Sequence, residues 1–168
     1  MTTITLHGDQ VTLSGSLPEV GSPAPSFTLT GSDLSDISLD DFSGKRVILN
    51  IFPSLDTDTC ARSVREFNKL AADLENTAVL CVSADLPFAA SRFCTVEGIE
   101  NVTAGSTFRS TFGVDYGVRM QDGPLAGLNA RSVVIIAPDG TVAYTQLVPE
   151  TVNEPDYNAV LAALETVK

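Results

Sequence analysis

Apolar positions along the chain follow two patterns, and the first of them predicts strands. Apolar and polar residues alternate between Ile4 and Leu13 on either side of Gly8, which predicts a small β-hairpin. Nearly continuous apolar runs bounded by turn residues predict buried strands, at 45–52, 77–84 and 131–137. Shorter strands are predicted at 27–30 and 141–148.

The second pattern, with apolar residues three and four positions apart, predicts helices. It is clearest after position 59, where one apolar helix face is formed by Cys60, Val64, Phe67, Ala71 and Leu74. Asp58 and Thr59 are the predicted N-caps of this helix, so Cys60 stands in its first turn. Further helical segments are predicted at 86–94, 107–112 and 157–167.

The order of these elements predicts the fold class. Strand, helix, strand and helix are followed by a hairpin and a final helix, which is typical of an α/β protein with a mixed central sheet flanked by helices. We therefore expect a thioredoxin-like core preceded by an N-terminal β-hairpin. The 168 residues suit one domain spanning 1–168, since no linker or repeat divides them.

Charge and hydropathy exclude several classes of partner. The formal net charge is −11, whereas nucleic acids and anionic membrane surfaces both require a basic face. No apolar stretch approaches the ~18 residues of a membrane span, and the N-terminal residues lack the basic and apolar regions of a secretion signal. We therefore expect a cytoplasmic protein that binds neither nucleic acid nor membrane.

The cysteines are the main candidates for chemistry, and they are Cys60, Cys81 and Cys94. An odd number of cysteines suits a reducing compartment rather than a disulfide scaffold. A zinc site is not indicated, because neither the cysteines nor His7 form a close ligand pair. His7, the single histidine, is interpreted as a solvated hairpin residue.

Cys60 has the surroundings of a reactive thiol. Only the ionised thiol is a nucleophile, and the first turn of a helix offers it free backbone N–H groups and a positive dipole end. The dipole is too weak to act alone, so an arginine must contribute, from Arg62, Arg65 or Arg131. The alternative is that Cys60 is an ordinary core residue, since free cysteine is often buried.

The segment that ends at Cys60 resembles a known signature. Pro53, Thr57 and Cys60 occupy the fixed positions of P-x-x-x-T-x-x-C, as in the peroxiredoxins. The string NIFPSLDTDTC is similar to the thiol peroxidase subfamily, and so are the N-terminal ITLHGDQVTLSGSLPEVGSPAPSFTL, SVREFNKLA after Cys60, SRFC around Cys94 and ARSVVIIAPDG near the C-terminus. The similarity covers nearly the whole chain.

The resemblance implies a peroxidase without a cofactor, in which the Cys60 thiolate attacks a hydroperoxide. It assigns Thr57 to orienting the peroxide and hydrogen-bonding the thiolate. Arg131 would hold the thiolate and polarise the peroxide, and Pro53 would shape and shield the pocket. Without the resemblance, Thr57 would be interpreted as a cap or turn residue and Arg131 as a solvated surface charge.

The resemblance makes Cys94 the resolving cysteine. A sulfenic acid on Cys60 would condense with it to an intramolecular disulfide. Disulfide-linked Cα atoms lie ~4.4–6.8 Å apart, so a cysteine that starts one helix and one that ends another are expected to meet only after a helical turn unwinds. The alternative is that Cys94 packs with Phe93 in the core. Cys81, in mid-strand without a neighbouring cation, is interpreted as buried and inert.

The resemblance also implies partners. They are a hydroperoxide substrate, thioredoxin as the reductant of the disulfide, and a second copy of the chain in a homodimer. The chain is not itself predicted to be a thioredoxin-type reductase, because Ser63 stands where C-x-x-C requires a cysteine. The alternative from another class is a peroxide sensor or redox-relay protein with little turnover.

Two features of the loops are left open by the sequence. Asp58 places a carboxylate two residues before the nucleophile, and we expect it to face water and to matter little. Three leucines either line an opening for alkyl hydroperoxides or belong to the core, namely Leu55, Leu125 and Leu128.

Overall fold

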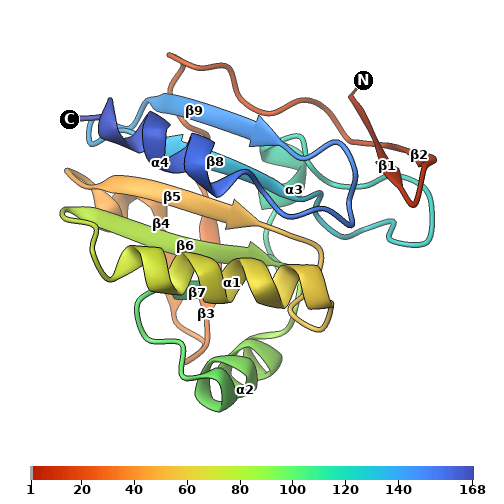
Figure 1. The fold of residues 1–168 in the computed structure, drawn as a ribbon, viewed down its shortest axis with the longest axis horizontal. Helices are drawn as coiled ribbons and strands as arrows, with labels where there is room; N and C mark the ends of the chain where they lie inside the picture. Colours follow the sequence, from red (N-terminus) through yellow and green to blue (C-terminus); the bar gives the residue numbers. More distant parts are fainter. Residues whose placement is uncertain (1) are drawn as a thin grey trace.

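A seven-stranded sheet forms the centre of the computed structural model, which describes residues 2–168 (Figure 1). Its strands, in spatial order, are β4 (Asp36–Ser38), β3 (Thr28–Gly31), β7 (Thr103–Ser106), β6 (Thr77–Ser83), β5 (Arg46–Ile51), β8 (Ser132–Ile136) and β9 (Val142–Leu147). A separate hairpin is formed by β1 (Thr3–Leu6) and β2 (Asp9–Thr12). The helices are α1 (Asp58–Ala71), α2 (Pro87–Glu97), α3 (Phe112–Asp115) and α4 (Tyr157–Glu165), with a 3-10 helix η1 at Leu39–Phe42.

Strand pairing gives the sheet its mixed character. β5 pairs parallel with β6, and β6 pairs parallel with β7, because α1 and α2 supply the crossovers that parallel neighbours need. β8 and β9 add an antiparallel hairpin along β5, and β3 and β4 add antiparallel strands beside β7. The predicted thioredoxin-like α/β class, with its mixed sheet and N-terminal hairpin, is confirmed.

Successive residues of β5 face opposite sides of the sheet and so contribute to two cores. Val47, Leu49 and Ile51 pack on the side of the hairpin and α3. Ile48 packs on the other side, where α1 and α4 cover the sheet (Figure 1). The buried residues of that second cluster are Ile48, Phe67, Val79, Val133, Ile135, Val160, Leu164 and Val167.

A third cluster lies between α1, α2 and β6. It joins Cys60 and Val64 of α1 to Cys81 of β6 and Ala90 of α2, and the half-buried Cys94 packs against it. The three cysteines are thus brought into one apolar region by elements that are consecutive in the chain.

Most of the predicted elements are confirmed to within a few residues, but the helix predicted at 107–112 is wrong. The Oγ atoms of Ser106 and Ser110 accept the backbone N–H groups of Phe108 and Phe112, so side-chain turns replace the helical hydrogen bonds there. α3 begins only at Phe112. The structure also adds elements that were not predicted, namely β4, η1 and β7.

Phe67 tests how much the packing of α1 contributes to stability. Its side chain is 1% exposed and its ring makes an edge contact with Tyr157 of α4, at 5.4 Å between centroids. We expect Phe67→Ala to lower the free energy of unfolding by about 3–5 kcal/mol, because the cavity cannot collapse between a helix and a sheet. Urea unfolding followed by circular dichroism measures this.

The matched control is Val96→Ala on α2, where the native side chain is 78% exposed. That change should alter the free energy of unfolding by less than about 0.5 kcal/mol. Equal losses in the two variants would contradict the assignment of Phe67 to the core.

Candidate active site

The register of β5 and β8 brings Cys60 and Arg131 together from distant parts of the sequence. Ile51, at the end of β5, pairs with Ser132, at the start of β8. The chain that leaves β5 enters α1 near Cys60, and the residue before Ser132 is Arg131. Ser132 also pairs with Leu147 of β9, so the segment after β9 leaves the sheet at the same end of the strands.

Cys60 lies in the first turn of α1, and its side chain has no exposed surface. The helix begins at Asp58 and its N-cap is Thr57, which corrects the predicted N-caps, Asp58 and Thr59. Asp58 is exposed to solvent, as expected. The Cys60 sulfur therefore lies where the backbone N–H groups of a helix start and its positive dipole end favour an anion.

Two buried polar residues that the sequence analysis missed fasten this turn to the sheet. The Ser63 hydroxyl donates to the Cys60 carbonyl at 2.8 Å, and the Asn50 side-chain amide donates to the Ser63 oxygen at 3.2 Å. Both side chains are fully buried. Their polar character inside apolar segments was the available signal, since a polar residue is buried only where it has a partner.

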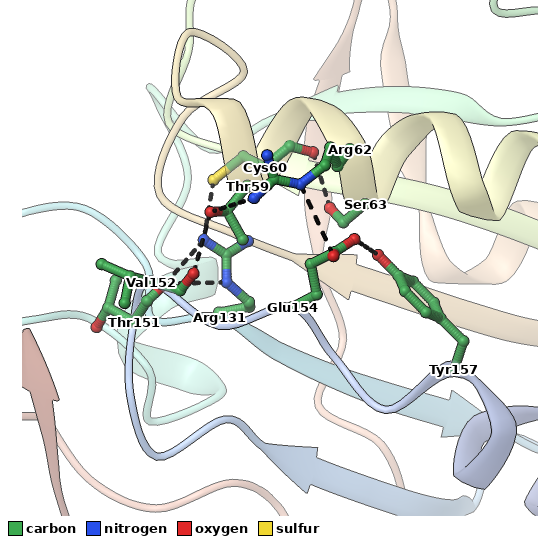
Figure 2. A network of polar contacts seen from close by, with 9 residues as sticks. All are labelled: Thr59, Cys60, Arg62, Ser63, Arg131, Thr151, Val152, Glu154 and Tyr157. Atoms are coloured by element: carbon green, nitrogen blue, oxygen red, sulfur yellow. Dashed lines mark hydrogen bonds and ion pairs between the residues drawn. The ribbon is translucent and has the colours of Figure 1, made fainter.

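Arg131 is buried rather than solvated, with 2% of its surface exposed. Its Nη2 lies 3.4 Å from the Cys60 Sγ and donates to the Thr151 carbonyl at 3.0 Å, and its Nε donates to the same carbonyl at 3.2 Å (Figure 2). The remaining nitrogen, Nη1, is buried and has no hydrogen-bond partner in residues 2–168. No carboxylate within residues 2–168 forms an ion pair with this guanidinium.

A buried cation without an anion is costly, so negative charge next to the Arg131 guanidinium would stabilise this site. The unpartnered Nη1 also leaves a charged donor group free on the guanidinium that contacts the sulfur. An incoming group with an oxygen acceptor would satisfy it, and charge that develops on that oxygen would strengthen the hydrogen bond.

The carbonyl that orients Arg131 is fixed by the N-terminal hairpin. The Thr151 N–H and hydroxyl donate to the Thr5 carbonyl, at 2.8 and 2.9 Å. The adjacent Glu150 carboxylate accepts the backbone N–H groups of His7 and Gly8 in the hairpin turn, at 3.2 and 2.8 Å. The His7 residue itself is exposed. Thr151 could not be found from the sequence, because it acts through a backbone carbonyl that every residue type carries.

A second set of contacts holds the segment after Thr151 against α1 (Figure 2). The Thr59 hydroxyl donates to the Val152 carbonyl at 3.1 Å, and the Arg62 Nε lies 3.7 Å from the Glu154 carboxylate. The same carboxylate accepts the Tyr157 hydroxyl at 2.8 Å. Arg62 is therefore occupied by Glu154, half exposed, and is not the cation beside Cys60.

Pro53 and Thr57 lie on the loop between β5 and α1. Pro53 is buried directly beyond β5, and Thr57 is exposed at the N-cap. The Thr57 hydroxyl donates to the Ser54 carbonyl at 3.0 Å. No hydrogen bond joins it to the Cys60 sulfur among the described residues, so its predicted bond to the thiolate stays a prediction.

Cys94 lies in α2 as a free, half-buried thiol, and burial raises its pKa. It lines a small cavity together with Cys81. The C-terminal end of α2 is tied to α1 by an ion pair between Arg65 and Glu97, at 2.7 Å, and this hydrogen bond holds the pKa of Glu97 below its usual range. Arg65 is thus engaged with α2 and not with Cys60.

Cys81 has the properties of an inert core residue. Its side chain is 2% exposed, and burial raises its pKa to about 12 in spite of a 3.7 Å contact from the Asn50 amide. A thiol that stays protonated at neutral pH is a poor nucleophile.

The three leucines left open by the sequence lie in two different places. Leu55 is buried in the cluster that contains Cys60. Leu125 and Leu128 are partly buried against the separate cluster on the hairpin side of the sheet. Only Leu55 is therefore a neighbour of the candidate active site.

None of the helices in residues 2–168 has the length and apolar character needed to cross a bilayer. In the same residues, no cluster of three or more His, Cys, Asp or Glu side chains is arranged to hold a metal ion.

Comparisons with known proteins agree on one family. The Redoxin family profile matches residues 19–161. A thiol peroxidase of Mycobacterium tuberculosis is 60% identical over 164 residues, which are 98% of this chain and 99% of that protein. A thiol peroxidase of Corynebacterium glutamicum is 56% identical over 94% of this chain and 96% of that protein. The crystal structure of a peroxiredoxin-like protein from Aquifex aeolicus superposes with a TM-score of 0.94 at 39% identity, covering 98% of this chain and 96% of that one.

Arg131→Met tests whether the buried guanidinium activates the Cys60 sulfur. Methionine fills a similar apolar volume, so folding should survive. We expect the second-order rate of Cys60 oxidation by hydrogen peroxide to fall about 100-fold or more, as for the loss of a charged donor in a buried site. Competition with horseradish peroxidase for the peroxide measures this rate.

The matched control is Arg62→Met, which removes an exposed arginine from the same network (Figure 2). Its rate should stay within about threefold of the parent, because a half-exposed ion pair contributes little. A comparable loss in both variants would contradict a specific role for Arg131.

The raised pKa of Cys81 predicts a pH dependence of stability. The folded chain favours the neutral thiol, so its stabilising effect is complete below the ordinary value of 9.0 and is lost as the pH rises towards about 12. Cys81→Ala removes the group. Between pH 9 and 11 its free energy of unfolding should therefore fall less steeply than that of the parent, by up to about 1.4 kcal/mol per pH unit.

Urea unfolding at pH 7, 9, 10 and 11 gives both slopes. Other groups titrate in both proteins and cancel in the comparison. Parallel pH dependences would show that the Cys81 thiol ionises as easily in the folded chain as in the unfolded one.

Proposed function

This chain belongs to the redoxin family, in its thiol peroxidase branch, and we propose that it reduces hydrogen peroxide and organic hydroperoxides with Cys60 as the attacking thiol. The family membership makes it a thiol-dependent peroxidase with an antioxidant role. The observation that supports Cys60 as the nucleophile is the buried Arg131 guanidinium, 3.4 Å from its sulfur and without a carboxylate partner among the described residues.

The first step transfers one oxygen atom to Cys60. The thiolate attacks one oxygen of the hydroperoxide, the O–O bond breaks, and the products are a Cys60 sulfenic acid and an alkoxide or hydroxide that takes up a proton. Negative charge moves from sulfur to the leaving oxygen, and Nη1 of Arg131 is the free donor placed to follow it. Thr57 would orient the peroxide, and the buried Pro53 would exclude water from the pocket.

The second step would use Cys94 as the resolving thiol. Its sulfur attacks the sulfur of the Cys60 sulfenic acid, a disulfide forms and water leaves. The reacting partners lie on different helices, and α2 is tied to α1 by the Arg65–Glu97 ion pair. We expect disulfide formation to require local unwinding that breaks this link. Thioredoxin, a dithiol reductant, would then return both cysteines to thiols.

The setting that we propose is the cytoplasm, with the chain as a homodimer. The disulfide would form within one chain, so each protomer would complete the cycle by itself. A peroxide sensor that passes its disulfide to a partner is the second candidate, favoured by the complete burial of Cys60 and by the raised pKa of Cys94, both of which slow turnover.

Peroxide-dependent consumption of NADPH tests the cycle. The mixture contains the protein, thioredoxin, thioredoxin reductase, NADPH and hydrogen peroxide. We expect steady turnover that is lost in Cys60→Ser and in Cys94→Ser and is kept within about twofold in Cys81→Ala, which is the matched control for removing a thiol.

The readouts separate the two candidate functions. Oxidation of Cys60 by one equivalent of peroxide without turnover would favour the sensor. A Cys60 that peroxide does not oxidise would contradict both.

A further inference from the structure

Asp85 lies between the two elements that carry Cys60 and Cys94. It follows β6 and precedes α2, whose N-cap is Leu86. It also lines the same small cavity as Leu55, on the loop before Cys60, and as Cys94 itself. No role for Asp85 follows from the proposed function, because within residues 2–168 no hydrogen bond joins its carboxylate to either of the reacting sulfurs.

The Asp85 carboxylate accepts three hydrogen bonds. Oδ1 accepts the Ser54 hydroxyl at 2.7 Å, and Oδ2 accepts the Leu55 N–H and the Ser83 hydroxyl, both at 2.7 Å. The Asp85 carbonyl in turn accepts the Ser106 hydroxyl, which anchors the residue to β7. Short hydrogen bonds to an ionised carboxylate are among the strong ones in proteins, so Ser54 and Leu55 are held firmly to this residue.

The bonds from Ser54 continue to the start of α1. The Ser54 hydroxyl oxygen accepts the Asp56 N–H at 3.2 Å. The Ser54 carbonyl accepts both the N–H and the hydroxyl of Thr57, at 3.2 and 3.0 Å. Thr57 is the N-cap of α1, and its carbonyl accepts the Ala61 N–H at 3.0 Å. An unbroken series of hydrogen bonds therefore runs from the Asp85 carboxylate to the turn that holds Cys60.

The other links between this loop and α2 are weak by comparison. The ion pair of Asp56 with Arg92 spans 3.6 Å, and both side chains are more than 65% exposed, at 71% and 67%. Exposed pairs of this kind contribute little. Asp85 is thus the principal polar anchor of the loop, beside the apolar packing of Leu55.

We propose that Asp85 is a positioning residue for the peroxide step: through Ser54 it sets the position of Thr57 and of the first turn of α1, and hence of the Cys60 sulfur relative to Arg131. This inference rests on the proposed function of Cys60. It also assigns the start of α2 a fixed position during the cycle, so the unwinding that lets Cys94 move is confined to residues beyond that anchor.

Separate measurement of the two chemical steps tests the proposal. In a Cys94→Ser background, only the oxidation of Cys60 by hydrogen peroxide is observed, by quenched-flow trapping of the sulfenic acid and mass spectrometry. We expect Asp85→Ala to slow this step about tenfold or more. Ser83→Ala removes one bond to the same carboxylate without touching the loop, and it should slow the step less than twofold.

A double-mutant cycle distinguishes positioning from general loss of structure. Ser54→Ala should also slow the peroxide step, and the Asp85→Ala, Ser54→Ala double variant should be no slower than Asp85→Ala alone, because both act through one series of bonds.

In Asp85→Ala with Cys94 present, the rate of disulfide formation should stay within about twofold of the parent rate. If Asp85→Ala does not fold, Asp85→Asn replaces it, because the amide keeps one acceptor oxygen. The rate of its peroxide step should lie between the parent rate and the rate expected for Asp85→Ala.

Three outcomes would overturn the inference. They are a folded Asp85 variant that reacts at the parent rate, effects of Asp85 and Ser54 that multiply, and equal slowing of both chemical steps. A parent protein whose Cys60 forms no sulfenic acid would instead overturn the proposed function, and the positioning role with it.

Discussion

Arg131 is 2% exposed, and in the described part of the chain its guanidinium makes hydrogen bonds only to a backbone carbonyl and to a sulfur. A cation in that position, without a carboxylate partner among the described residues, would destabilise the fold unless an anion shared the site. The Cys60 sulfur, 3.4 Å from Nη2, is the group placed to carry that negative charge. Charge balance in the core and the proposed activation of the nucleophile would therefore depend on the same contact.

Much of the remaining architecture serves to hold these two groups in place. The N-terminal hairpin, remote in sequence, fixes Thr151 and so fixes the carbonyl that orients Arg131. On the other side, Asn50 and Ser63 fasten the turn that contains Cys60 to β5. Although the hairpin is separate from the main sheet, its turn and strand take part in the hydrogen bonds on which the position of Arg131 depends.

The fold class and the candidate nucleophile could be predicted from the sequence because both leave local signals. A buried apolar run followed by capping residues and a helical period specifies a strand–helix unit, and Cys60 falls at its junction. On chemical grounds alone Arg131 was one of three candidate arginines, and the resemblance assigned it to the thiolate. The pairing of Ile51 with Ser132 explains why it is the arginine that lies beside the sulfur. Pairing partners are set by tertiary contacts that periodicity does not encode.

The elements that escaped prediction depend on their neighbours for their conformation. β7 has the sequence Thr-Ala-Gly-Ser, with weak strand preference, and becomes a strand because β3 and β6 lie on either side of it. Gly105 within it packs closely, since a Cβ there would lie 2.7 Å from a methyl carbon of Leu29 and would force that side chain to move. Thr151 and the Ser54 carbonyl act through the backbone, where residue identity carries no information.

The complete burial of Cys60 has a consequence for the supply of electrons. A protein reductant needs to touch a sulfur to attack it, and the reduced enzyme offers it none at this position. In the proposed cycle, only formation of the Cys60–Cys94 disulfide would bring this sulfur to the surface, where a reductant could bind. The reduced protein, which would be the most abundant form when peroxide is scarce, would therefore leave the reductant free to act on other disulfides.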